Sequence, residues 1–228
     1  MDQQQPITVA LTGASGALYG LRLVEVLLDS GLAVDFLLSE AARVVLEREC
    51  GLSWQGGDEA VAREVSDYFR VDAGRLRYFG VRDWFSPLAS GSGGVRKMVV
   101  CPCSMGTLAA IAGGMSDNLI ERAADVTIKE GGDLILVPRE TPFSVIHLEN
   151  MLKLARLGVV ILPAAPGFYH GAQGGEGAQN GSVPDQDPPR VAELSAPRVS
   201  DLVDFLVGRI LNRLKIPHKL TRAWPEVG

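Results

Sequence analysis

Short apolar runs alternate with segments of helical periodicity along most of this chain. Ile7–Leu11 is a β-branched apolar run typical of a buried strand, and residues 17–28 carry apolar side chains at helical spacing. The same alternation predicts strands at 33–38, 97–101, 134–137 and 159–163, and helices at 40–50, 58–69, 108–113, 118–129, 144–156 and 199–214. Strands that alternate with helices predict an α/β fold of three layers, with a mainly parallel sheet and helices on both faces.

Segments with glycine, hydroxyl, charged or aromatic residues that could contact a ligand follow several of these strands. They are the 13–16 turn, Ser39, residues 104–107, Arg139 with Glu140, and Phe168 with Tyr169. In parallel sheets ligands bind outside the carboxyl ends of the strands, so these positions predict one binding site. A glycine-rich turn that leads into a helix leaves backbone N–H groups free for an anion, and Ser15 adds a hydroxyl donor. The spacing G-x-x-G-x-x-x-G differs from the dinucleotide fingerprint G-x-G-x-x-G, which disfavours NAD.

Composition narrows the class of protein. The chain has 228 residues, of which 46% are hydrophobic and 21% charged, as is usual for a globular protein. Its net charge of −5 argues against a nucleic-acid surface, and no apolar run approaches the ~18 residues of a membrane span. The first residues lack the pattern of a secretion signal, and the three cysteines fit small buried residues in a reducing compartment better than a metal site or a disulfide. We therefore expect a cytoplasmic protein without a metal.

One segment changes character. Residues 171–197 are rich in Gly and Pro and contain no aromatic residue, so this segment cannot bury enough surface to order alone. We predict a single domain over residues 1–214 with a flexible insertion at 171–197, followed by a C-terminal tail at 215–228.

Three cations stand close to these motifs in a chain that is acidic overall: Arg122, Lys129 and Arg139. Arginine binds phosphate through two parallel hydrogen bonds and lysine acts as a point charge. Pro138 and Pro142 flank Arg139 and Glu140 and limit where both side chains point, which favours a functional role for this pair.

Two enzyme classes are excluded by spacing. Short-chain dehydrogenases share the opening Thr-Gly-Ala-Ser-Gly but need a lysine four residues after a tyrosine, whereas here the four tyrosines are followed at that distance by Leu23, Asp72, Arg82 and Gln173. A serine hydrolase is excluded because no G-x-S-x-G elbow is present.

Several longer motifs, in the same order, resemble the flavin prenyltransferase family, long named 3-octaprenyl-4-hydroxybenzoate carboxy-lyase. They are Gly-Ala-Ser-Gly-Ala-Leu-Tyr-Gly at 13–20, Pro-Cys-Ser-Met-Gly-Thr-Leu-Ala-Ala-Ile-Ala at 102–112, Asp-Asn-Leu at 117–119, Pro-Arg-Glu-Thr-Pro at 138–142 and Gly-Phe-Tyr-His at 167–170. Arg122, Asp125 and Lys129 match as well. The match covers residues 7–170 and resumes over 199–214.

The resemblance implies a Rossmann-like, FMN-binding homo-oligomer, typically a dodecamer, with sites between subunits. It also implies the reaction: dimethylallyl phosphate and reduced FMN give prenylated FMN and phosphate without a metal, and the product is the cofactor of a partner decarboxylase. The resemblance places FMN on nine residues: Gly13, Ala14, Ser15, Ser39, Ser104, Met105, Gly106, Thr107 and Arg139. It places the prenyl phosphate on Tyr169 and Arg209, with Lys129 and Arg122, and catalysis on Glu140, Glu49 and Ser15.

Two departures and two rival functions remain at this stage. The family often has Lys where Gly106 stands, and its short connection after residue 170 is replaced here by the 171–197 insertion.

A related FMN-dependent cysteine decarboxylase would carry Pro-Ala-Ser-Ala-Asn-Thr at 102–107 and Met-Asn in place of Arg139 and Glu140. A non-catalytic flavin-binding subunit of an aromatic acid decarboxylase would not need the second set of cations and carboxylates.

Overall fold

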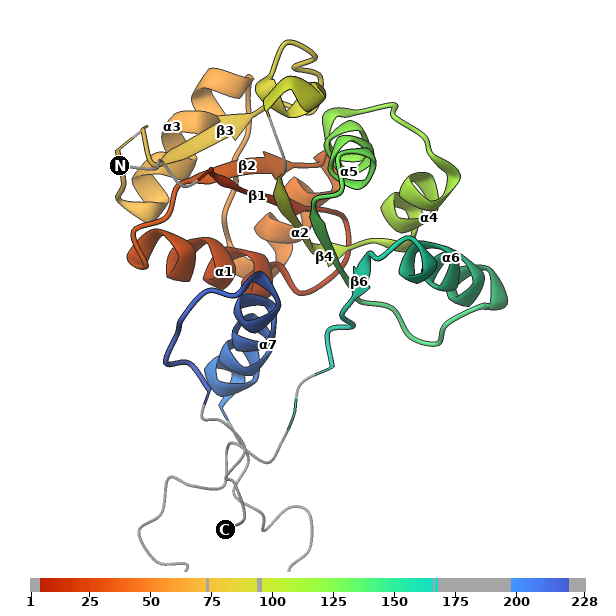
Figure 1. Cartoon of the computed structure of the whole chain (residues 1–228). Helices are drawn as coiled ribbons and strands as arrows, with labels where there is room; N and C mark the ends of the chain where they lie inside the picture. The colour runs from red at the N-terminus through yellow and green to blue at the C-terminus, as the bar shows by residue number, and fades with distance from the viewer. Residues whose placement is uncertain (1–4, 73, 94–95, 166, 168–197, 222–228) are drawn as a thin grey trace, which may run out of the picture. The chain divides into compact units, whose positions relative to one another are not determined.

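The computed structural model describes residues 5–72, 74–93, 96–165, 167 and 198–221 (Figure 1). The chain divides into two compact units, Met1–Ala164 and Ala165–Gly228. The first unit contains the sheet and six of the described α-helices, and the second contains one helix. Each unit is described by itself below.

The first unit is built on one six-stranded parallel sheet with the strand order β3-β2-β1-β4-β5-β6. The strands are β1 (Ile7–Leu11), β2 (Val34–Leu38), β3 (Leu76–Phe79), β4 (Lys97–Cys103), β5 (Asp133–Pro138) and β6 (Val160–Ile161). The predicted α/β class and parallel sheet are confirmed. This strand order is that of the Rossmann fold, in which the direction of winding reverses between β1 and β4.

Three strands differ from the prediction by two residues or more at an end, and one of them is β6, which covers only Val160–Ile161 of the predicted 159–163. β3 was not expected, because only Leu76 of its four residues is fully buried and the strand lies at the edge of the sheet. β4 continues two residues beyond the predicted end at Cys101, with a shift of register between Val100 and Cys103. The Cys-Pro-Cys segment is therefore part of a buried strand.

Six helices connect the strands: α1 (Ala17–Asp29), α2 (Glu40–Cys50), α3 (Asp58–Phe69), α4 (Met105–Gly113), α5 (Leu119–Lys129) and α6 (Val145–Arg156). Side-chain caps start four of them, at Ser39, Ser104, Asn118 and Ser144. Because right-handed crossovers run in opposite directions from the centre of the sheet, α1 and α2 cover one face and α4 to α6 the other. Figure 1 shows α1 and α5 on opposite sides of the central strands.

Close packing fixes the helices against the sheet. β1 and β2 are buried along their whole length, and the apolar sides of α4, α5 and α6 join the same core as β4 and β5. A Cβ atom added at Gly20 would lie 2.3 Å from the carbonyl oxygen of Cys101, so only glycine lets α1 approach β4 this closely. Two 3₁₀ turns, η1 (Pro87–Ala89) and η2 (Gly91–Gly93), precede β4.

The second unit contains α7 (Val199–Leu214), which has the predicted bounds. Arg198 and Asp201 exchange hydrogen bonds at its start. The predicted insertion at 171–197 lies outside the described residues, and the single-domain boundary at 214 stays a prediction. No helix among the described residues is long and apolar enough to cross a bilayer.

Candidate functional site

The site is centred where the winding of the sheet reverses, at the carboxyl ends of β1 and β4. Thr12 follows β1 and is buried. Its hydroxyl donates to the carbonyl oxygen of Pro102 at 2.9 Å and accepts from the backbone N–H of Ser104 at 2.7 Å, while its own N–H donates to Pro102 at 3.1 Å. These three hydrogen bonds hold the loop after β1 against the loop after β4. We call this contact the Thr12 clamp.

The two clamped loops carry backbone donors that suit a phosphate. Among the described residues, the N–H groups of Gly13, Ala14, Met105 and Gly106 have no protein acceptor. Met105 and Gly106 begin α4, where the helix dipole adds positive potential. Gly13 and Gly106 are exposed and Met105 is partly buried, so these N–H groups are open to a bound anion, which fits a phosphate. The two predicted loops are thus brought together, as the sequence analysis expected.

Two serines border the same loops. Ser39 caps α2 by accepting from the N–H of Ala42 at 3.0 Å, and its own N–H donates to Leu11 at 3.1 Å at the end of β1. Ser104 caps α4, accepts from the N–H of Thr107 at 3.3 Å and lies 3.1 Å from the Thr107 hydroxyl. Each serine hydroxyl accepts one hydrogen bond from its helix. The Ser104 hydroxyl also donates to Thr107, whereas the proton of the Ser39 hydroxyl is available to a ligand.

The start of α1 already holds an anion, which is the carboxylate of Glu49. The N–H of Gly16 donates to its two oxygens at 2.9 and 3.2 Å, and the N–H of Ala17 donates at 3.0 Å. Burial by itself raises the pKa of Glu49, but hydrogen bonds from the Ser15 hydroxyl and these N–H groups, with the charge of Arg139, lower it overall. The sequence analysis expected an anion at this helix start; the structure shows that the chain's own carboxylate occupies it.

Arg139 and Glu140 follow β5 and reach the same edge of the sheet. The Nε of Arg139 donates to the carbonyl oxygen of Ser15 at 3.2 Å, across 124 residues of sequence. The carboxylate of Glu140 is exposed and accepts from the N–H of Thr141 at 3.0 Å. The expected pair is therefore beside the Ser15 turn, with Arg139 turned toward it.

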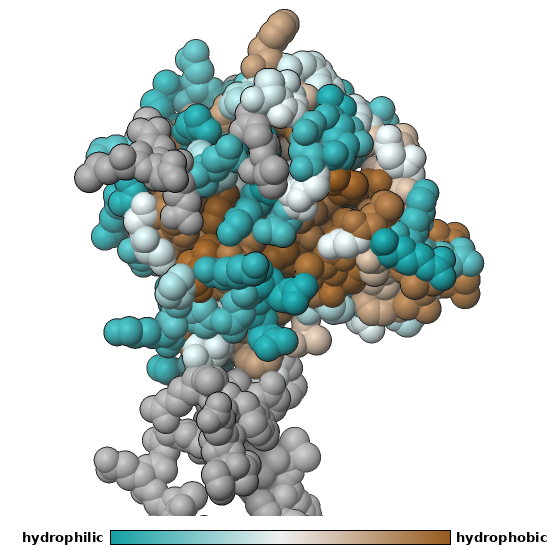
Figure 2. Space-filling view, in the orientation of Figure 1, coloured by the Kyte–Doolittle hydropathy of each residue, from teal (hydrophilic) through white to brown (hydrophobic). Residues whose placement is uncertain are grey.

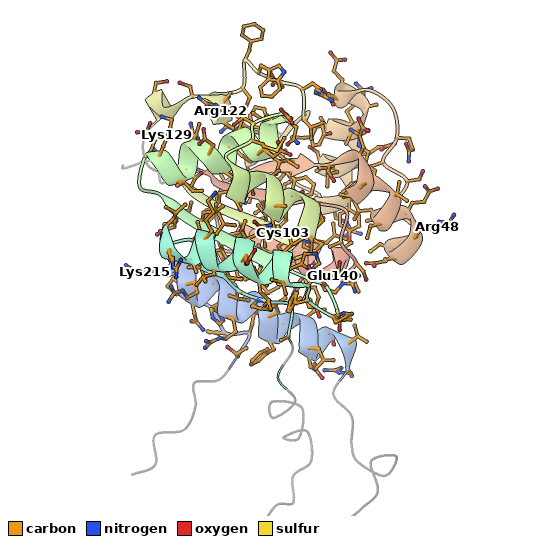
Figure 3. The ribbon with its side chains drawn as sticks, turned by 90° about the vertical axis from the view of Figure 1, so that its right-hand side faces the viewer. Arg48, Cys103, Arg122, Lys129, Glu140 and Lys215 are labelled. Carbon is orange, nitrogen blue, oxygen red and sulfur yellow. The ribbon has the colours of Figure 1, made fainter. Side chains whose placement is uncertain are left out.

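Arg122 and Lys129 do not join this cluster. The Nε of Arg122 donates to the carbonyl oxygen of Ala89 at 3.0 Å, and Lys129 pairs with Glu130. Lys129 lies on α5 before β5 begins, whereas Glu140 lies after β5 ends, so the two occupy opposite ends of that strand. Figure 3 shows Arg122 and Lys129 well apart from Glu140. Within one chain the three cations therefore do not form one cluster, because Arg139 contacts the Ser15 turn whereas Arg122 contacts Ala89 and Lys129 lies at the other end of β5.

The remaining predicted residues are placed as follows. Tyr169 lies outside the described residues, and Arg209 is an exposed residue of α7 in the second unit. Gly106 is exposed, and an added Cβ would meet no atom within 4 Å, so the backbone there leaves room for the Lys that the family often has.

The cysteines have no visible chemical role. Cys101 and Cys103 are fully buried, and burial raises the pKa of Cys103 to about 12 and that of Cys101 further, so both stay protonated. All three cysteines are free thiols. The described part of the chain contains no group of three His, Cys, Asp or Glu residues arranged for a metal ion.

Two residues of this site were not singled out by the sequence analysis. Thr12 forms the clamp, and its only sequence signal is its place directly after a buried strand. Tyr19 lies against the Ser15 turn, since a Cβ added at Gly16 would be 2.8 Å from its ring. Burial raises the pKa of Tyr19 and nearby Cys101 adds to this, while the charge of Arg139 opposes it.

Comparisons with known proteins identify a family and solved structures of similar fold. The Flavoprotein family model matches residues 1–211. The flavin prenyltransferase UbiX of Pseudomonas aeruginosa is 48% identical over 226 residues, which is 99% of this chain and 97% of that protein. The structure of AnUbiX in complex with FMN and dimethylallyl pyrophosphate superposes with a TM-score of 0.74 at 32% identity, covering 99% of this chain and 100% of the other. The structure of a dodecameric FMN-dependent UbiX-like decarboxylase from Escherichia coli gives a TM-score of 0.73 at 33% identity, covering 97% and 100%.

Proposed function

The chain belongs to the flavin prenyltransferase family, and from that premise we propose that it transfers a dimethylallyl group from dimethylallyl phosphate to reduced FMN. The allylic C–O bond breaks, and bonds form from the dimethylallyl carbons to N5 and C6 of the flavin, giving prenylated FMN and phosphate. The observation that carries the proposal is the Thr12 clamp, which joins two loops with unpaired N–H donors beside Arg139 and Glu49.

FMN fits the clamped loops through its phosphate. The free N–H groups of Gly13, Ala14, Met105 and Gly106 supply hydrogen bonds without a charged side chain, and Ser39 adds a hydroxyl. We assign Ser15, Ser104, Thr107 and Arg139 to the same ligand. Reduced FMN supplies the nucleophilic N5 and C6; the protein supplies their position and the groups that move protons.

Proton balance explains why carboxylates are needed. N5 and C6 each lose a proton, the prenyl chain gains one and the departing phosphate gains another. Glu140 is exposed at the site edge and free of any ion pair among the described residues, so we assign it the proton exchanged with the phosphate. Glu49, with its lowered pKa and its hydrogen bond from the Ser15 hydroxyl, is ionised at neutral pH and suits proton removal near the flavin.

Cations stabilise the charge that develops on the leaving phosphate. We assign Lys129, Arg122, Tyr169 and Arg209 to this role. Because Lys129 and Glu140 lie at opposite ends of β5, one chain cannot bring both to one phosphate, and the site is completed by another copy. We accordingly propose a homo-oligomer, as in the dodecameric relative, and a decarboxylase that receives prenylated FMN. The three free thiols support a reducing, cytoplasmic location.

The decisive experiment incubates the chain anaerobically with reduced FMN and either dimethylallyl phosphate or dimethylallyl pyrophosphate, and measures the mass of the flavin. A flavin heavier by the dimethylallyl unit supports the proposal and shows which donor is used. An unchanged flavin with FMN still bound supports a non-catalytic flavin-binding subunit, and decarboxylation of a cysteine peptide with no prenylated flavin supports the rival cysteine decarboxylase.

Glu140→Gln tests the proton role. The change keeps the size and the hydrogen-bonding atoms, so FMN affinity should stay near the parent value. Single-turnover formation of prenylated FMN, with FMN and donor saturating, should fall by ~10²-fold or more. Arg48→Gln, at an exposed position on α2, is a matched control that should leave the rate unchanged. A Glu140 variant with the parent rate overturns the assignment.

A further inference from the structure

The outer side of α6 is unusually apolar. Val145, Ile146, Leu148, Leu152 and Leu157 are each between 51 and 69% exposed, and we call them the α6 surface. The opposite side of the same helix is buried through Met151 and Leu154. Figure 2 shows brown side chains interspersed with teal ones over α6, at the right of the view. A monomeric protein rarely leaves so many large apolar side chains together in water, so this surface fits a protein partner.

The charged residues on this surface identify the partner. Glu149, Lys153 and Arg156 line a shallow groove with Leu152 and Leu157. In the part of the chain that the structure describes, none of the three forms an ion pair. Residues three or four apart share one side of a helix, so Glu149 and Arg156 lie on one stripe with Leu152 between them. The groove therefore offers a negative and a positive charge at its two ends.

This arrangement is complementary to itself. Glu149 and Arg156 stand at equal distances in sequence from the point between Leu152 and Lys153. When two α6 helices lie antiparallel about a twofold axis at that point, Glu149 of each copy faces Arg156 of the other, and the two Leu152 side chains lie beside the axis. A twofold contact uses the same patch on both copies and needs this self-complementarity.

We propose that the α6 surface is a twofold contact between two copies of this chain. The inference rests on the homo-oligomer of the proposed function and names the surface that forms it. It fits the dodecameric relative, because assemblies with dihedral or tetrahedral symmetry contain twofold axes.

A charge exchange tests the proposal. Glu149→Arg places two arginines opposite each other, and Arg156→Glu places two glutamates, so each single variant should give a smaller particle by native mass spectrometry. The double variant restores opposite charges and should regain the parent mass. Leu152→Asp sets two like charges near the axis and should also reduce the mass. Val44→Asp is the control, because Val44 is an exposed apolar residue on a different helix, α2, and should leave the mass unchanged.

The outcomes separate the two proposals. If the parent chain is monomeric, the proposed oligomer itself is wrong, whatever the flavin assay gives. If the parent is oligomeric but Glu149→Arg, Arg156→Glu and Leu152→Asp keep its mass, the oligomer stands and the α6 contact is overturned. Variants with the parent mass and a lower melting temperature would overturn it too, since residues 165–228 of the same chain would then cover the surface. FMN binding to each variant checks that it is folded.

Discussion

Removing the hydroxyl of Thr12 should weaken both the fold and FMN binding. Thr12→Val keeps the shape and volume of the side chain but deletes the hydrogen bond donated to Pro102 and the one accepted from Ser104. Thr12→Ser keeps the hydroxyl and loses only a methyl group, so it is the matched control. The Thr12 N–H still donates to Pro102 in both variants, which leaves the Ser104 N–H as the group that loses its partner.

The size of the effect follows from these contacts. Each hydrogen bond contributes ~1 kcal/mol net, so the free energy of unfolding should fall by ~2 kcal/mol in Thr12→Val. For a chain of this length that corresponds to a melting temperature lower by ~4–8 °C, compared at one protein concentration because the protein is proposed to be oligomeric. The clamp also sets the spacing of the two phosphate loops, so FMN binding should weaken by about tenfold, which corresponds to ~1.4 kcal/mol of binding free energy.

Two measurements check the reasoning. Differential scanning calorimetry gives the melting temperatures, and titration of FMN followed by flavin fluorescence gives the dissociation constants. Thr12→Ser should stay near the parent in both. If Thr12→Val and Thr12→Ser bind FMN equally well, the hydroxyl does not hold the loops and the site has another origin.

Three further predictions concern the framework of the site. Gly20→Ala should lower the melting temperature by several degrees, since its new methyl group would lie 2.3 Å from the Cys101 carbonyl oxygen. Gly113→Ala is the control and should leave the melting temperature unchanged, because the nearest atom there is 3.7 Å away. Equal melting temperatures of the two variants by calorimetry would contradict this. Burial raises the pKa of Asp35 although Arg77 opposes the shift, so the contribution of Asp35 to stability is lost as pH rises through the folded pKa. In a urea unfolding series from acid to neutral pH, Asp35→Asn should therefore gain stability relative to the parent as pH rises, and a pH-independent difference would refute this. The pKa of Glu49 is lowered, so Glu49→Gln should cost ~0.3–1 kcal/mol of unfolding free energy at pH 7, and the same urea series must show that difference shrinking as pH falls below 4.5.

Local patterns predicted the framework well. The strand, turn and helix over residues 7–28 follow from a buried apolar run, two glycines and helical spacing, all within one short segment. Ser39 caps α2 because it directly precedes the predicted helix at 40–50, whereas α4 begins at Met105, three residues before the predicted start at 108, so the cap at Ser104 was not expected. β3 was missed because only one of its four residues is fully buried, so its sequence lacks the apolar signal of the inner strands.

Contacts between distant segments account for what the sequence did not reveal. The resemblance alone gave Glu49 a role, and no local pattern marked it; only the packing of α2 beside α1 puts its carboxylate 2.9 Å from the N–H of Gly16. Thr12 and Ser104 are joined across 92 residues, and no local rule connects them. Such hydrogen bonds depend on the strand order, which residue patterns constrain but do not specify.

The separation of Lys129 from Glu140 leads to a last prediction. The six residues of β5 at ~3.3 Å each put about 20 Å between the two ends of the strand, too far for both side chains to reach one phosphate. If both residues act, each site takes Lys129 from one copy and Glu140 from another. Lys129→Ala and Glu140→Gln should each be nearly inactive alone. Mixed oligomers made by co-expressing equal amounts should regain about a quarter of the parent rate, because one pairing in four combines an intact Lys129 with an intact Glu140. Single-turnover prenylation measures this recovery. A mixture as inactive as its two components would place both residues on the same copy and contradict the shared site.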